Sequence, residues 1–504
     1  MSGETVLDFI TEPLLQFGHD QCLDDPKDGL FAFGPLLERK PSQMRIGILG
    51  TPEGLARYRT WVQSITRYIP AAKPDSNHHA AFPGFEAVFN TRWPSEPAVE
   101  IPISAAEISR RIRIGDRHLA IYETVTAFAD PIKRKLRDDD VVVDLWFVIV
   151  PEEVYRLGRP LSRVPSAERI DVPGRLNPKL AQRLLREPSF FPQEMKDAEV
   201  YRYDLNFHHQ LKARLIDVKA VVQIVRDSSI GPQTGTYEPG SRRMQDPATL
   251  AWNLCTTSFF KAGGRPWKLA NVRKGVCYVG LVFKKTTAEI ENRNACCGAQ
   301  MFLDSGDGLV FKGAIGPWYS AETKDFHLPR TEARRLIELI VRSYTDIHNA
   351  PPTELFIHGR TRFSDDEWQG FQDGVPAGTK VVTVRIVRSS DFKLYRSGRT
   401  PVIRGTAYQL SLRRAFLWTA GFIPRLQTYP GREVPNPLSI ELCQGEADIS
   451  TVLNDVMGLT KVNFNACIFA DGLPVTLRFA EAVGEILTAA PQTDGPPLPF
   501  RHYI

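Results

Sequence analysis

The ten-residue run VVVDLWFVIV (Val141–Val150) restricts the fold most strongly, because it is apolar almost without interruption. A strand of this kind is typical of a parallel sheet that is covered on both faces. RIGILG (Arg45–Gly50) predicts a second buried strand with a helix after it, and FEAVF (Phe85–Phe89) predicts a further strand. The alternation of strands and helices over residues 45–230 therefore indicates a Rossmann-like α/β domain.

The chain changes its rhythm near Gly275. Three strands are predicted in succession, at GVCYVGLVFKK, AQMFLD and LVFKGAI, and the amphipathic helix RTEARRLIELIVRSYTDI follows them. ELFIHG, SDDEWQGF and TKVVTVRIV then predict a strand, a helix capped by Ser364 and another strand. The order βββαβαβ is the plan of the ribonuclease-H fold, although other α/β folds share parts of it.

Length and composition set the remaining limits. From 504 residues we expect a segment over 1–40 that packs on the rest, a Rossmann-like domain over 41–268 with an insertion at about 151–200, and a ribonuclease-H-like domain over 269–504. A net charge of +5 is too small for a general nucleic-acid coat, so nucleic acid would need positive charge gathered in a groove. Seven scattered cysteines predict a reducing, cytoplasmic compartment, and neither a membrane span nor a secretory signal is predicted.

Four polar residues between positions 204 and 264 form the most informative cluster. DLNFHHQLKARL predicts a helix on which His208 and Lys212 share one face. VVQIV predicts a strand that carries Gln223, and LAWNLCTTSFFKAGG predicts a helix with Lys261 in its last turn. Such side chains, where they meet near helix ends, can hold a terminal phosphate through charge-assisted hydrogen bonds. Each residue alone is more simply a solvated surface group, so the combined spacing carries the prediction.

The order His208, Lys212, Gln223, Lys261 resembles the pocket for the guide 5′ phosphate in the MID domain of Argonaute proteins, and NLCTTSFFKAGG resembles the helix at the second lysine. His208 stands where many longer relatives have Tyr. TPVIRGTAYQLSLRRAFLWTAGFIP, EVPNPLSIE and LPVTLRFAEAVGEIL resemble a PIWI domain. EPLLQFGHDQCLDDPKDGLFAFGPL and RNACCGAQMFLDSGDG resemble short prokaryotic Argonautes. These contain only MID and PIWI, and act with a separate APAZ-domain partner that carries a TIR or sirtuin-like NADase.

The resemblance implies a Rossmann-like MID domain followed by a ribonuclease-H-like PIWI domain, with His208, Lys212, Gln223 and Lys261 binding the 5′ phosphate of a small guide RNA. It also implies that Gln223 and the terminal carboxylate of Ile504 hold Mg²⁺ against that phosphate. A phosphate and a carboxylate repel each other unless a hard cation bridges them, and Mg²⁺ prefers oxygen ligands. The alternative is that the last residues only fill an apolar cleft.

A nuclease of the ribonuclease-H type needs clustered carboxylates that hold two divalent ions. The first strand, GVCYVGLVFKK, has no acid, and Val282 falls where the resemblance places an aspartate. The fourth strand ends in His358, Gly359 and Arg360 where another acid is expected, which leaves Asp471 as a candidate. One carboxylate does not make a two-metal site. We therefore expect a catalytically inactive PIWI domain and no enzymatic activity in this chain.

The leading hypothesis from the sequence is a guide-RNA-dependent sensor of invading single-stranded plasmid or phage DNA, which base pairing recognises. Target pairing is expected to switch on the NADase of the APAZ partner, in a heterodimer or a higher oligomer, and to deplete NAD as an abortive-infection defence. Two alternatives stay open. One is an autonomous metal-dependent guided nuclease whose carboxylates lie outside the assigned strands. The other is a nucleic-acid-binding scaffold that uses no guide.

Overall fold

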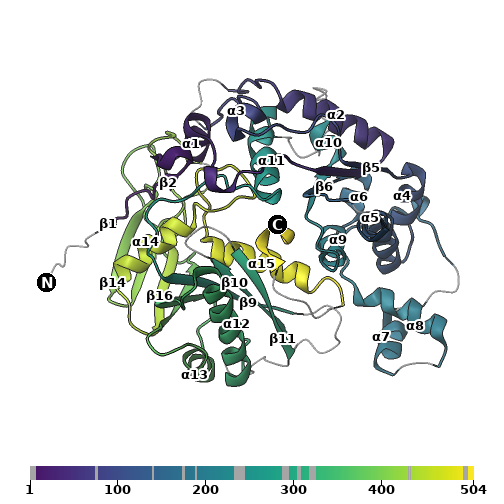
Figure 1. Ribbon diagram of the computed structural model, residues 1–504. Helices are drawn as coiled ribbons and strands as arrows, with labels where there is room; N and C mark the ends of the chain where they lie inside the picture. Colours follow the sequence, from purple (N-terminus) through teal and green to yellow (C-terminus); the bar gives the residue numbers. More distant parts are fainter. Residues whose placement is uncertain are drawn as a thin grey trace.

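The computed structural model describes residues 7–73, 78–138, 141–172, 176, 178–187, 190–231, 245–285, 295–302, 308–316, 325–429, 431, 433–491 and 498–504. Parts of the RNACCGAQMFLDSGDG segment lie outside these residues. The described strands form three sheets of four, ten and three strands. In Figure 1 the four-stranded sheet and the ten-stranded sheet lie in separate halves of the molecule, and the C-terminus lies between them.

The four-stranded sheet is parallel throughout, in the order β5-β4-β6-β7. Its strands are β4 (Ile46–Gly50), β5 (Val99–Pro102), β6 (Leu145–Val150) and β7 (Val222–Arg226). The helices of this half include α2 (Pro52–Ile65), α4 (Ala105–Ile112), α5 (Arg117–Asp138), α6 (Glu152–Leu157), α9 (Phe207–Ile216), α10 (Asp227–Ile230) and α11 (Pro247–Lys261). Every residue of β4 and β6 is buried, as their apolar runs require. The predicted Rossmann-like α/β half is confirmed.

One predicted strand of this half is wrong: FEAVF forms the short helix α3 (Phe85–Phe89). Phe85, Val88 and Phe89 are buried, and the positions between them are exposed. This i, i+3, i+4 spacing belongs to a helix, and a five-residue apolar run is too short to distinguish helix from strand by composition. Asn90 ends the helix in the left-handed conformation with φ +50°. The strand beside β4 is β5, further along the chain.

The ten-stranded sheet has the order β1-β14-β15-β16-β13-β12-β9-β10-β11-β17. Its first part is β9 (Val276–Lys285), β10 (Ala295–Phe302), β11 (Gly308–Gly316), α12 (Arg330–His348), β12 (Glu354–Gly359), α13 (Asp365–Asp373) and β13 (Lys380–Arg388). This is the predicted βββαβαβ order, with β12 parallel to both β9 and β13. The later elements are β14 (Thr406–Ser411), β15 (Arg414–Leu417), β16 (Leu438–Gln444), α14 (Ile449–Leu459) and α15 (Val475–Leu487). The ribonuclease-H-like half is confirmed.

Three further segments attach to these halves. β1 (Asp8–Phe9) joins the ten-stranded sheet, and β2 (Leu15–Gln16) pairs with β3 (Cys22–Leu23) and β8 (Lys268–Leu269), ahead of α1 (Pro26–Phe33). Between residues 151 and 200, α7 (Pro178–Arg186) and α8 (Pro192–Glu199) project away from both sheets (Figure 1).

The domain boundaries at residues 40 and 268 stay predictions. Within the described residues, no helix combines the length and apolar character that a bilayer crossing requires.

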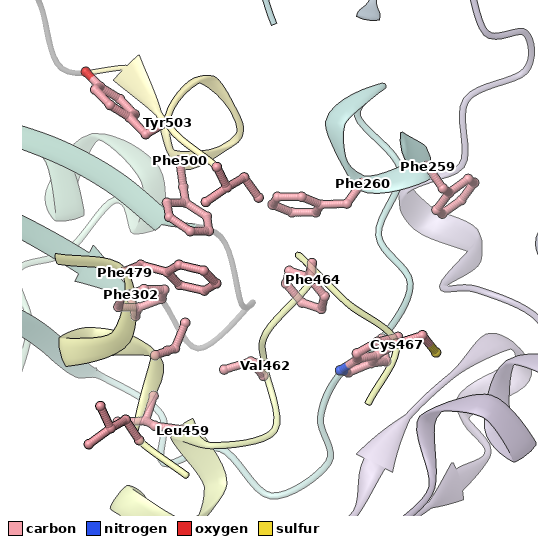
Figure 2. Packing of buried hydrophobic residues seen from close by; sticks show 14 of the residues in the cluster. Phe259, Phe260, Phe302, Leu459, Val462, Phe464, Cys467, Phe479, Phe500 and Tyr503 are labelled. Carbon is pink, nitrogen blue, oxygen red and sulfur yellow. The ribbon is translucent and has the colours of Figure 1, made fainter. Parts of the chain in front are cut away.

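An aromatic core joins the two halves around the C-terminal tail, which forms β17 (Leu498–Pro499) and a 3₁₀ turn (Phe500–His502). Figure 2 shows Phe500 beside Phe479 of α15, with Phe260 of α11 and Phe464 reaching the same cluster. The ring of Phe500 lies 4.4 Å from that of Phe479, and the rings of Phe260 and Phe464 are 4.7 Å apart. This packing holds the last residues against both halves of the molecule.

Candidate guide-phosphate site

Helix α9 presents the first part of the site. Its N-cap is Asn206, whose side-chain oxygen accepts hydrogen bonds from the backbone N–H groups of His208 (3.0 Å) and His209 (3.4 Å). Lys212 follows His208 by one turn, as the spacing predicts. The Lys212 side chain is buried, with only 4% of the residue exposed, whereas His208 is exposed. The helix therefore directs one lysine into the protein and keeps a histidine above it in contact with solvent.

The second lysine enters from α11. Lys261 is the last residue of this helix and is 1% exposed. Its Nζ donates to the Val222 carbonyl oxygen (2.9 Å) and to the Gln223 Oε1 atom (2.8 Å). Gln223 is the second residue of β7. Two predicted site residues, 38 positions apart in the chain, are thus in direct contact.

The C-terminal tail completes the arrangement. The Tyr503 carbonyl oxygen accepts a hydrogen bond from Lys212 Nζ at 3.3 Å, although the two residues are 291 positions apart. Tyr503 and Ile504 are both 5% exposed and belong to the joining core. The tail therefore fills an apolar cleft and also reaches a site lysine, while a metal-binding role of the Ile504 carboxylate stays a prediction.

The electrostatics of the two lysines are unusual. Desolvation lowers the pKa of Lys212 to about 7. Desolvation, followed by the charge of Lys212, holds the pKa of Lys261 well below its ordinary value. Among the described residues, neither ammonium has a carboxylate within 4.0 Å.

Two buried cations without a counter-ion are costly, because a charge removed from water needs a partner of opposite sign. An anion bound between them supplies that partner and restores the charge on both lysines. A terminal phosphate with two negative charges suits the pair, and the Gln223 side chain, already in contact with Lys261, is at hand to take part. The structure thus joins Lys261 to Gln223 and Lys212 to Tyr503, next to Ile504, and the charge of Lys212 acts on Lys261. His208 lies at the solvent side.

Sequence reasoning missed Arg501. Its Nη1 atom lies close to Gly263 (φ +96°), two residues after Lys261. A Cβ added to this glycine would be 3.1 Å from that atom. Its Nε atom is buried and has no hydrogen-bond partner among the described residues. The sequence signal, one arginine in a short tail, gives no hint that the tail returns to α11.

An ion pair lies at the level of the sheet where the sequence analysis expects metal-binding acids. Gly280 of β9 is the register partner of His358 of β12. Two residues further along these parallel strands, Val282 therefore lies level with Arg360. Arg360 forms an ion pair with Glu481 of α15. His358 is 1% exposed, and its Nδ1 atom contacts the Thr476 hydroxyl at 2.9 Å. Burial lowers the pKa of His358 to about 3, which makes it a neutral core residue.

Asp471, the remaining candidate acid, has protein partners among the described residues. Its carboxylate accepts from Asn463 Nδ2 at 2.9 Å and lies 3.4 Å from Arg478 Nε. The described residues contain no group of three or more His, Cys, Asp or Glu side chains that could hold a metal ion. The absence of cleavage activity stays a prediction.

The sequence matches no family model and no curated protein, but the fold has relatives of known structure. The chain is similar to Clostridium butyricum Argonaute bound to a guide DNA and a 19-mer target DNA, with 16% identity and a TM-score of 0.62 over 97% of this chain and 53% of that one. The chain has an Argonaute-like fold.

Two more Argonaute-like structures give the same result. Drosophila Piwi matches at 12% identity and a TM-score of 0.55, over 96% of this chain and 54% of that protein. A. aeolicus Argonaute matches at 12% identity and a TM-score of 0.55, over 98% and 54%. This chain therefore spans about half the length of these proteins. The Rossmann-like half and the ribonuclease-H-like half are consistent with a MID–PIWI architecture.

Proposed function

We propose that this chain is the guide-binding and target-sensing subunit of a prokaryotic immune complex, as a short Argonaute made of MID and PIWI domains. The observation that carries the proposal is the pair Lys212 and Lys261, buried without a carboxylate partner among the described residues. The Argonaute fold supports it, since the C. butyricum protein with this fold is bound to a guide and a target.

In this proposal Lys212 and Lys261 bind the 5′ phosphate of a small guide RNA, and Gln223 and His208 add hydrogen bonds. The oxygens of Gln223 and of the Ile504 terminal carboxylate are of the type that Mg²⁺ prefers, so the residues present fit this ion. Bound there, Mg²⁺ would offset the repulsion between the terminal carboxylate and the phosphate. Because Gln223 Oε1 already accepts from Lys261, phosphate oxygens and water would supply the other ligands of the ion.

The target is proposed to be single-stranded plasmid or phage DNA that pairs with the guide, while the protein follows the backbone. Ion pairs such as Arg360–Glu481 stand where metal-binding carboxylates would be needed, which supports a PIWI domain that does not cut. The output must then come from another subunit. We propose an APAZ-domain partner in the cytoplasm, with a TIR or sirtuin-like NADase that target pairing activates, in a heterodimer or a higher oligomer.

The most direct test is to identify the nucleic acid that copurifies with the chain expressed with its genomic neighbours. The proposal expects small RNAs of a narrow length range with 5′ phosphates, and tighter binding of a 5′-phosphorylated guide than of the same guide with a 5′ hydroxyl. Heterogeneous nucleic acid together with equal binding of the two guides would instead indicate a scaffold that uses no guide.

Cleavage is tested separately. We expect a guide-matched target to remain uncut in Mg²⁺ or Mn²⁺, with the chain alone or with its partner. The Val282→Asp variant should not restore cutting, because one added carboxylate leaves a two-metal site incomplete. Guide-matched product bands from the unmodified chain would establish the nuclease alternative.

A further inference from the structure

The two faces of the ten-stranded sheet have different surroundings. Val381 of β13 belongs to the core that α12 and α13 form with the sheet, and Arg385 lies on the same face because the side chains of a strand alternate. Val384 points the other way, into the joining core that also contains Ile504. We call the side that carries α12 and α13 the outer face. It is turned away from the C-terminal tail and from the guide-phosphate site.

Arginines form a row across the outer face. Arg385 is the register partner of Glu441 of β16, and Glu441 is the partner of Arg414 of β15. Residues that are directly opposite in neighbouring strands share one face of the sheet, and these strands lie roughly 4.8 Å apart. Arg362, between β12 and α13, reaches Glu441 with its Nη2 atom at 2.7 Å. Together with Arg413, in the turn between β14 and β15, these residues make up the arginine row.

The arginine row carries more positive charge than its carboxylate neutralises. Glu441 serves both Arg362 and Arg385, whose Nη1 atom lies at 3.4 Å. The guanidinium group of Arg413 donates to three backbone carbonyl oxygens at 3.0–3.2 Å, at the end of β16 and just beyond it. Arg414 lies over an aromatic ring of its own strand, 5.9 Å from the ring centroid. Among the described residues, neither Arg413 nor Arg414 has a carboxylate within 4.0 Å.

Two exposed leucines border the arginine row. Leu412, in the same turn as Arg413, is 82% exposed, and Leu410 of β14 is 45% exposed. Large apolar side chains that gather at one exposed place mark a surface that a binding partner covers. The outer face thus offers positive charge and apolar surface side by side.

This combination selects the chemistry of the partner. A guanidinium group presents a planar fork of N–H donors that matches a carboxylate, and the contact of Arg362 with Glu441 shows that a carboxylate fits here. The side chain of Arg362 is 70% exposed, and exposed ion pairs stabilise a protein little, so an incoming carboxylate can replace Glu441 at small cost. A nucleic-acid backbone would satisfy the charge but has no aliphatic side chains to cover Leu410 and Leu412.

We propose that the arginine row binds an acidic segment of another protein, in which carboxylate and apolar side chains alternate. The carboxylates contact Arg362 and Arg414, and the apolar side chains cover Leu410 and Leu412. The proposal does not depend on guide binding, because no residue of the row belongs to the guide-phosphate site.

The test measures how tightly the full chain binds a fluorescent peptide in which glutamate and leucine alternate. The same peptide with glutamine in place of glutamate should bind at least about tenfold more weakly, because its charge is lost. Arg362→Gln with Arg414→Gln should weaken binding of the acidic peptide by about tenfold. The control is Arg334→Gln, which removes an exposed arginine of α12 that is paired with Glu338 and lies outside the row. It should bind the peptide as the unmodified chain does.

Two further variants separate the parts of the surface. Glu441→Gln removes the carboxylate that competes with the peptide, so it should strengthen binding by up to about fivefold, an effect in the opposite direction to damage of the fold. Leu412→Ser should weaken binding by about threefold or more, because apolar contact is lost. Leu339→Ser, at an exposed position of α12, is its control and should have no effect.

Several outcomes would overturn the proposal. These are equal binding of the acidic and glutamine peptides, no binding of either, and equal binding of the acidic peptide by the double variant and by Arg334→Gln. A short single-stranded DNA with the same number of negative charges is the last probe. If the double variant weakens DNA binding as much as peptide binding, the row attracts anions in general and the proposal is wrong. Unchanged melting temperatures of the variants confirm that folding is not the cause. No guide is needed in these measurements, so they are valid whether or not the proposed function holds.

Discussion

Two regions of this protein bury lysines, and they handle the charge in opposite ways. Lys212 and Lys261 meet carbonyl and amide oxygens, and neither has a carboxylate within reach among the described residues. Lys461, whose side chain is fully buried, donates to Glu12 Oε1 at 2.9 Å and to the Asp24 carbonyl oxygen at 2.6 Å. One region leaves its positive charge uncompensated, and the other neutralises it internally.

The network of Glu12, Arg404 and Lys461 connects the N-terminal segment to the PIWI-like half. Glu12 also accepts from Arg404, at 2.9 Å from Nε, and Arg404 donates to the Thr460 hydroxyl at 2.7 Å. Burial raises the pKa of Glu12, but the charges of Arg404 and Lys461 outweigh it and hold this pKa below its ordinary value. Desolvation lowers the pKa of Lys461 to about 8, and Glu12 opposes that shift. Every charged group here has a partner, which is typical of a structural role.

The difference teaches how to distinguish a binding site from a structural network. A buried cation without a counter-ion reduces the stability of the free protein, and it is useful only if a ligand brings the missing negative charge. The Lys212–Lys261 pair fits that description and the Lys461 network does not. Four predictions test the contrast.

The largest effect is expected when the Lys461 network loses its carboxylate and so comes to resemble the Lys212–Lys261 pair. Glu12→Gln removes the carboxylate that Arg404 and Lys461 share, and leaves two buried cations. Breaking a buried ion pair costs about 3–5 kcal/mol, and the partial exposure of Glu12 places this variant at the lower end. Thermal unfolding should show a clearly lower melting temperature. Glu53→Gln, which affects an exposed pair with Arg57, should change it little.

A loss of guide affinity without a loss of stability is expected for Lys212→Met. Methionine keeps an apolar stem in the buried position and removes the charge, so the free protein should be as stable as the unmodified one or more stable. Binding of a 5′-phosphorylated guide should weaken by about tenfold to a hundredfold, because a hydrogen bond to a charged group contributes roughly 1.5–3 kcal/mol. Binding of a 5′-hydroxyl guide should change much less.

Lys261→Met should reduce guide affinity similarly, while single changes at His208 or Gln223 should have smaller effects. Lys196→Met, at an exposed position of α8, is the control for the loss of one positive charge. Equal weakening of both guide types by Lys212→Met would mean that this lysine contacts the nucleic-acid backbone in general. A marked fall in melting temperature would mean that Lys212 is structural.

Much of the fold can be predicted, because it depends on local patterns. The apolar run at Leu145–Val150 of β6, the Ser364 cap of α13 and the helical spacing of His208 and Lys212 are all visible in short windows of sequence. The strand predicted at Phe85–Phe89 is wrong because five apolar residues suit either a strand or a helix.

The site is predictable only in part, because its contacts join distant segments. The resemblance to Argonaute proteins singles out Lys212 and Lys261, but no periodicity shows that Tyr503 would contact the first of them. The approach of Arg501 to Gly263 and the pairing of Glu12 with Lys461 across 449 positions are equally invisible to local patterns. Such contacts arise from how the two halves pack.

A pH dependence of guide binding is the next expected effect. With a pKa of about 7 in the free protein, Lys212 is largely neutral above that pH, whereas in the unfolded chain it stays charged to about pH 10. The stability of the free protein should therefore rise as the pH increases from about 7 to about 10. A bound phosphate favours the charged lysine, so above pH 7 guide binding must take up a proton. Its affinity should then fall by up to about tenfold per pH unit.

The measurement compares 5′-phosphorylated and 5′-hydroxyl guides between pH 6.5 and 9. The lower limit keeps the phosphate mainly dianionic, since its second pKa is roughly 6. Only the phosphorylated guide should show the decline, and Lys212→Met should reduce it. The same pH profile for both guides would show that the titrating group does not face the phosphate.

The smallest effect, less than about tenfold in affinity, is expected from extending the chain beyond Ile504. The buried side chains of Phe500, Tyr503 and Ile504 anchor the tail in the joining core, and the Tyr503 carbonyl holds Lys212. An extension of a few Gly and Ser residues moves the terminal carboxylate away and leaves these side chains in place if it can leave the cleft. We expect binding of the 5′-phosphorylated guide to weaken and to lose part of its Mg²⁺ dependence, because one proposed oxygen ligand of the ion is removed.

Truncation after Phe500 is the matched comparison, since it removes the Tyr503 and Ile504 anchors together with the hydrogen bond to Lys212. It should lower the melting temperature as well as guide affinity, whereas the extension should change affinity alone. An extended chain that binds the phosphorylated guide as tightly as the native chain, with the same response to Mg²⁺, would show that the tail only fills the cleft. The Lys212–Lys261 pair would then have to balance the charge of the phosphate without a metal ion. In that case Lys212→Met should cause a larger loss of guide affinity.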